Sequence, residues 1–151
     1  MRRFLSSLKP LLAAAFVSNA AYVKRKLAPL NLKSAGDSVS FGMSHSLVGA
    51  YEVGLGVENR IPMTLPRLRL EPTFKLKAAW VGGECLWELR GNYSPWWDDE
   101  KSGFTLVRFV VPDSIPLKTP VNFELTLVNP CDDFTSRYGE SYVYCCKFSD
   151  K

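Results

Sequence analysis

Histidine is nearly absent from this sequence, and the motifs that many enzymes need are missing. His45 is the single histidine among 151 residues, so any catalytic triad or histidine base would have to use it. It lies in an expected loop between two strands, where a lone histidine is usually a solvated turn residue. The sequence contains no phosphate-binding loop, no G-x-G-x-x-G and no G-x-S-x-G. We therefore expect no catalytic residue, no cofactor and no enzymatic activity.

A basic patch is also lacking. The formal net charge is +4, but three of the basic residues lie within residues 1–20, which contain no Asp or Glu. After residue 20, 16 basic residues stand against 15 acidic ones. Binding to nucleic acid depends on clustered Lys and Arg that contact phosphates, so we expect no nucleic-acid partner.

The cysteine spacing argues against a metal site. Cys85, Cys131, Cys145 and Cys146 include no C-x-x-C pair, and zinc needs four ligands that converge on one point. Adjacent strand residues such as Cys145 and Cys146 point to opposite faces, so we expect no metal. Cys131 lies in an expected turn, residues 129–133, that leads back toward the last strand. We predict a disulfide from Cys131 to Cys145 or Cys146, with buried free thiols as the alternative.

Long hydrophobic runs are lacking as well. Residues 11–17 form an unbroken apolar run, far shorter than the roughly 20 residues that span a bilayer. A basic segment precedes the run, and the small residues in 18–20 suit a signal-peptidase site. The positive charges at 24–26 oppose translocation, so an N-terminal helix packed on the domain is the alternative. We predict that residues 1–20 are a signal peptide or such a helix, that the protein lies in the periplasm or cell envelope, and that it contacts membrane only through an uncleaved N-terminal segment.

From residue 36 on, apolar and polar residues alternate with the period of two that is typical of strands. The expected strands are 36–43, 51–58, 64–70, 73–80, 85–89, 103–111, 121–128 and 141–148. Short strands separated by turn signals are typical of an antiparallel sandwich. We predict an all-β chain: a single antiparallel β-sandwich, immunoglobulin-like or jelly-roll-like, over residues 36–151. A linker, residues 21–35, and the N-terminal hydrophobic helix or signal segment precede it.

An aromatic and acidic segment lies between two of the expected strands, where side chains ordinarily face water. Trp and Tyr are enriched in binding hot spots because they bury a large area with few rotatable bonds. Neighbouring carboxylates suit a partner with a basic rim. One Trp capping the open end of the sandwich is the structural alternative. The predicted partner-binding residues are Tyr93, Trp96, Trp97, Asp98, Asp99 and Glu100.

Several stretches of the chain follow a family pattern, namely 29–32, 36–41, 51–55, 61–65 and 67–70. They resemble a bacterial envelope family that is catalogued as domain of unknown function 5625, over about residues 29–130. The resemblance implies a β-sandwich and brings no catalytic residues. Members typically carry an export signal, often with a lipid-attachment Cys that this chain lacks. Small envelope proteins of this type include candidates for immunity proteins, which block toxins delivered by neighbouring bacteria.

These observations together favour a non-enzymatic, exported bacterial binding protein. Its most specific form is an immunity protein that occludes a secreted antibacterial toxin, so the expected partner is a protein. The alternative is a carbohydrate-binding or structural envelope module that uses Trp96 and Trp97 as a stacking platform.

Overall fold

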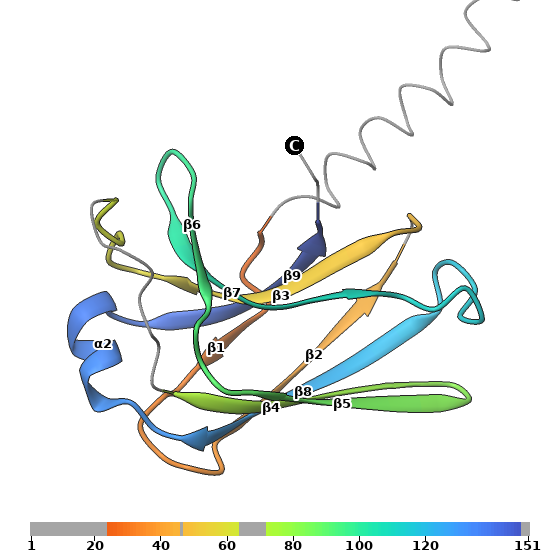
Figure 1. The fold of residues 1–151 in the computed structure, drawn as a ribbon, viewed down its shortest axis with the longest axis horizontal. Coiled ribbons are helices and arrows are strands. Elements are labelled where there is room, and N and C mark those ends of the chain that lie inside the picture. The colour runs from red at the N-terminus through yellow and green to blue at the C-terminus, as the bar shows by residue number, and fades with distance from the viewer. Residues whose placement is uncertain (1–23, 46, 64–71, 149–151) are drawn as a thin grey trace, which may run out of the picture.

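Two antiparallel β-sheets pack face to face in the computed structural model, which describes residues 24–45, 47–63 and 72–148 (Figure 1). The strands are β1 (Ala28–Leu30), β2 (Ser38–Ser44), β3 (Ala50–Val57), β4 (Thr73–Trp80), β5 (Gly83–Leu89), β6 (Ser94–Trp97), β7 (Ser102–Val110), β8 (Pro120–Asn129) and β9 (Ser141–Lys147). The first sheet has the order β1-β9-β3-β7-β6, and the second has the order β2-β8-β4-β5. The predicted all-β sandwich is confirmed.

The core lies between the two sheets and follows the alternation of the sequence. In β8, Val121, Phe123, Leu125 and Leu127 are buried while the residues between them face outward. Each such side chain contributes about 1.5–3 kcal/mol when it is fully removed from water. Strand β3 is different, because seven of its eight residues are buried. The outer face of β3 is therefore also buried, although it points away from the opposite sheet. The side chains that cover this face form the candidate site described below.

A short helix that the sequence pattern did not predict closes one end of the sandwich. Helix α2 (Asp132–Tyr138) follows β8, with Asp132 and Asp133 in its first turn, where carboxylates favour the helix dipole. Phe134 and Tyr138 are four residues apart, so they share one face and are both buried. Figure 1 shows α2 at one end of the two sheets. Seven residues are too few for a helical period to stand out in the sequence.

The predicted linker 21–35 is wrong over part of its length. It contains β1, which pairs with β9 through Ala28 opposite Val143 and Leu30 opposite Ser141. Leu30 is buried in the core. A three-residue strand shows no alternation that a sequence pattern could reveal, so only the pairing identifies it.

Two further predictions, the strand over 64–70 and the N-terminal segment over 1–20, lie outside the described residues. Among the residues that are described, no helix has the length and apolarity needed to cross a membrane.

Candidate functional site

The predicted aromatic loop is in fact a strand, β6, which pairs with residues 102–105 of β7. Because neighbouring strand residues point to opposite faces, Trp96 and Trp97 have different surroundings. Trp97 points inward, packs against the core, and donates a hydrogen bond from Nε1 to the Ile61 carbonyl at 2.8 Å. Trp96 points to the outer face of the five-stranded sheet. The segment therefore supplies one core ring and one ring for the outer face.

Tyr93 is not a surface residue, which corrects its place among the predicted contacts. Only 3% of it is exposed, and its ring packs within the core. Its hydroxyl lies 2.9 Å from the carbonyl oxygen of Leu89 and 3.1 Å from that of Pro72, and it donates a hydrogen bond there. Burial raises the pKa of Tyr93 to about 12. The residue thus fastens the chain between β5 and β6 and is closed to a partner.

The three predicted acids lie at the tip of the β6–β7 hairpin, and all three are exposed. The tip is a tight turn in which Oδ1 of Asp98 accepts hydrogen bonds from the backbone N–H groups of Glu100 and Lys101. Arg60 donates from its guanidinium to the carbonyls of Asp98 and Asp99, at 3.2 and 3.1 Å. Figure 1 shows the hairpin rising away from the two sheets. The backbone of the tip is fixed while its carboxylates face water.

A buried carboxylate, Glu52, lies at the centre of the outer face of the same sheet and was not singled out from the sequence. Only 3% of Glu52 is exposed. Its carboxylate lies 3.1 Å from Nζ of Lys24 and 3.5 Å from Nε of Arg108. The hydroxyls of Tyr144 and Thr105 donate to it at 3.3 and 3.4 Å. A buried charge is tolerated only when it is paired and hydrogen-bonded in this way.

Aromatic side chains from neighbouring strands lie over glycines around this carboxylate. Gly54 lies beneath Tyr144, Gly56 beneath Tyr142 and Gly103 beneath Trp96, and a Cβ at any of these glycines would collide with the ring above it. The sequence signal was present, because glycine occupies alternate positions of β3 on the face that also carries Glu52. Alternate glycines leave a shallow trough that rings from neighbouring strands can fill.

Two of these rings and the carboxylate surround one ammonium group. Nζ of Lys24 lies 5.0 Å from the ring centroid of Trp96 and 5.6 Å from that of Tyr144. The two rings meet edge to face, with centroids 5.4 Å apart and planes at 90°. Aromatic faces attract a cation within about 6 Å. We call Glu52, Trp96 and Tyr144 the ammonium cage.

The cysteines near this site are poor nucleophiles. Cys146 is buried on the outer face, with Sγ 3.8 Å from Oε1 of Glu52, and burial raises its pKa to about 12. Cys145 points inward, with Sγ 3.3 Å from Sδ of Met43, and burial raises its pKa as well. Both thiols stay protonated near neutral pH, and a thiol reacts through its thiolate.

The predicted disulfide is not formed, because Cys85, Cys131, Cys145 and Cys146 are all free thiols. Cys131 immediately precedes α2, so the chain returns to the sheet only at Ser141, the start of β9. Cys145 lies four residues further along the strand, which is about 13 Å at the rise of a β-strand. Cys146 points to the other face of the sheet.

His45 also differs from its prediction as a solvated turn residue. It is 3% exposed, its ring lies edge-on to Tyr51 at 6.4 Å, and its Nδ1 atom has no hydrogen-bond partner. Nowhere in residues 24–45, 47–63 and 72–148 do three or more His, Cys, Asp or Glu residues gather to hold a metal ion.

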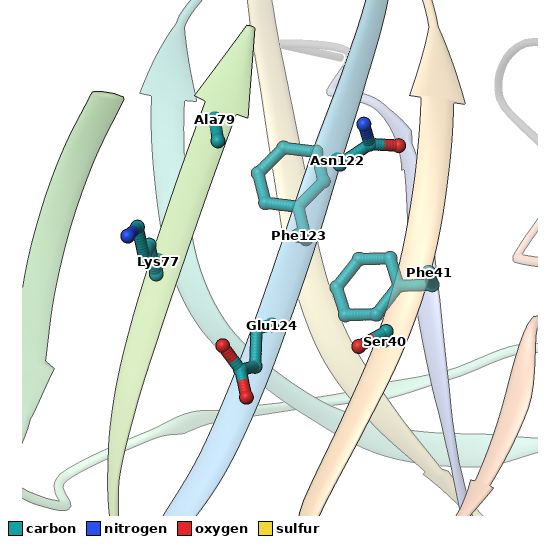
Figure 2. A pocket seen from close by; sticks show the side chains of 7 residues that line it. All are labelled: Ser40, Phe41, Lys77, Ala79, Asn122, Phe123 and Glu124. Atoms are coloured by element: carbon teal, nitrogen blue, oxygen red, sulfur yellow. The ribbon is translucent and has the colours of Figure 1, made fainter. Parts of the chain in front are cut away.

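The outer face of the four-stranded sheet is polar and carries a shallow hollow of about 470 Å³. Figure 2 shows Lys77 and Glu124 on neighbouring strands of this hollow. The rings of Phe41 and Phe123, which also line it, stack on one another at 5.2 Å and belong to the core. A separate apolar hollow of about 240 Å³ opens between β5 and β7, where Trp87 and Phe109 are among its lining residues. Neither hollow contains one of the predicted contact residues.

Comparisons with known proteins bear on the fold. No protein-family profile matches the chain, and no curated protein matches it in sequence. In structure it is similar to a protein from Sulfurospirillum deleyianum that is known from a crystal structure, with a TM-score of 0.54 and 10% sequence identity. The similarity covers 82% of this chain and 96% of that chain. At such low identity the likeness shows the sandwich fold and no activity, and the resemblance to the envelope family stays a prediction.

Proposed function

We propose that this protein is a non-enzymatic bacterial binding protein, exported to the periplasm or cell envelope, that docks the tip of its β6–β7 hairpin on a basic surface of a protein partner. The most specific form of the proposal is an immunity protein whose partner is a secreted antibacterial toxin. The exposed carboxylates of Asp98, Asp99 and Glu100 on a fixed turn are the observation that carries it.

Preorganisation and negative charge both favour docking at this tip. Arg60 and the side chain of Asp98 fix the backbone of the tip, so little conformational entropy remains to be lost on docking. Three neighbouring carboxylates attract a basic partner over about a Debye length and speed its encounter with the tip. Raised thiol pKa values at Cys145 and Cys146 leave these residues protonated, which favours a binding role over nucleophilic catalysis.

The carbohydrate-binding alternative has weaker support. Stacking on a sugar needs an exposed ring, whereas the ring of Trp97 packs against the core and the indole of Trp96 lies against Tyr144 and Lys24. We therefore do not favour these rings as a stacking platform.

The test compares two triple variants that each remove three negative charges. The first is D98N/D99N/E100Q at the tip. The control, E84Q/E88Q/E124Q, changes exposed acids on the four-stranded sheet. Each chain is mixed with a candidate secreted toxin, and the association rate is measured by surface plasmon resonance at low and high salt. Protection of growth is measured in cells exposed to the same toxin.

We expect the tip variant to associate about tenfold more slowly at low salt, with the difference shrinking at high salt because surface charges are screened. The control should match the wild type. Equal rates for the two variants would contradict the role of the tip. Binding without protection of growth would refute the immunity form and leave the binding function in place.

A further inference from the structure

We propose that the ammonium cage is a binding site for a primary alkylammonium group, such as a lysine side chain of a second molecule. In this structure Lys24 of the same chain occupies the site. The site lies on the sheet face and not at the hairpin tip, so the inference does not rest on the proposed function.

The walls of the cage are built by the sheet and not by its occupant. Tyr144 belongs to β9, Glu52 to β3 and Trp96 to β6. Trp96 and Tyr144 are seated over Gly103 and Gly54, where no side chain could fit. Because strand pairing and these close approaches hold the rings at right angles, the walls remain in place when Lys24 is withdrawn.

The occupant, in contrast, comes from the chain that precedes β1. The segment is tied to the sheet at Leu27, whose backbone N–H donates to the carbonyl of Val143 at 2.9 Å. Arg25 and Lys26 are exposed. The side chain of Lys24 is 26% exposed, so solvent reaches the occupant of the cage.

The chemistry of the walls selects a primary ammonium. One carboxylate, which Arg108 shares, lies 3.1 Å from the ammonium, and two aromatic faces within about 6 Å attract it. The side chain of Arg108, half-exposed and 3.5 Å from the same carboxylate, adds a positive charge that opposes a divalent metal ion. The planar guanidinium of an arginine is broader than the compact ammonium that this geometry holds.

Trp96 adds a second indication that the site is more than packing. Its Nε1 is buried and has no hydrogen-bond partner. Buried indole N–H groups usually find an acceptor. The position of Trp96 instead leaves its N–H unpaired and turns the aromatic face toward Lys24.

The test removes the Lys24 side chain from the cage and adds a small alkylammonium ion as a substitute ligand. In Lys24→Ala the walls remain, and n-butylammonium, which has the shape of the lysine side chain, is titrated and followed by NMR of the indole N–H signals. The neutral probe 1-butanol controls for apolar binding. Lys26→Ala is the matched control variant, because it removes the same charge from an exposed neighbour. Lys24→Met refills the cage with an uncharged chain.

We expect n-butylammonium to bind Lys24→Ala at least about tenfold more tightly than wild type, Lys26→Ala or Lys24→Met. The neutral 1-butanol should show no such preference, and Lys24→Ala/Glu52→Gln should lose it. Equal binding of n-butylammonium by Lys24→Ala and Lys26→Ala overturns the proposal.

A thermal measurement covers the case in which Lys24→Ala folds poorly. A ligand that binds the folded state raises Tm, so n-butylammonium should raise the Tm of Lys24→Ala above the value in equal NaCl and leave that of Lys26→Ala unchanged. The same shift in both variants, or none in either, overturns the cage. None of these variants alters the acidic tip, so failure here leaves the proposed function untouched.

Discussion

Replacing Trp97 separates a core role from a binding role for the aromatic segment. Its ring packs against the main core, and its Nε1 donates to the Ile61 carbonyl at 2.8 Å. Truncating a buried Trp to Ala costs about 3–5 kcal/mol. Because Trp97 is half-buried, we expect the low end of that range, about 3 kcal/mol for Trp97→Ala. In a chain of this size such a loss lowers Tm by roughly 10 °C.

A second variant divides this loss into packing and hydrogen bonding. Trp97→Phe keeps most of the ring but leaves the Ile61 carbonyl without its donor, which should cost about 1–2 kcal/mol. Urea unfolding followed by circular dichroism gives both values, and partner affinity is measured on the same samples. A Trp97→Ala variant that melts within about 2 °C of wild type but loses its partner would refute the reasoning and return Trp97 to the binding surface.

Three further changes test other parts of the structure. Gly54→Ala should destabilise the fold by about 3 kcal/mol in urea unfolding, because a new Cβ would collide with the hydroxyl of Tyr144 and with the backbone carbonyl of Phe104; stability equal to wild type would contradict this close packing. Burial raises the pKa of Tyr93 from 10 to about 12, so its neutral form stabilises the fold fully below pH 10 and this contribution disappears as pH rises through 12. Wild type should therefore lose more stability than Tyr93→Phe between these pH values, and parallel losses would contradict the assignment. Because the pKa of Cys146 is about 12 and that of Cys145 is also raised, iodoacetamide at pH 8 should label them only after denaturation, as mass spectrometry of peptides would reveal; rapid labelling of the folded chain would count against their burial.

The likeness to the protein from Sulfurospirillum deleyianum illustrates how far fold and function are separated here. Two chains that share 10% of their residues have similar folds over most of their length. Alternating apolar residues of about the right size are enough to specify a sandwich. Function depends on individual side chains, so the proposals above rest on Asp98, Glu52 and their neighbours and not on the fold.

The sequence predicted the longer strands well because apolar and polar residues alternate along each of them. In β8, apolar residues at alternate positions indicate both the strand and its inward face before any partner is known. The elements it missed, β1 and α2, are too short for a period to repeat. The expected loop at 92–100 contains β6, which exists because residues 102–105 pair with it.

The sequence alone determined an all-β chain with an inward and an outward side to each long strand, since alternation is a local property. The tertiary structure decided which outward residues meet. Lys24, Glu52, Trp96 and Tyr144 are distant in sequence and come together because β9, β3, β7 and β6 lie in that order in one sheet. No local pattern encodes strand order, and the burial of Glu52 follows from it. The same pairing separated Trp96 from Trp97, because adjacent residues of a strand must face opposite sides.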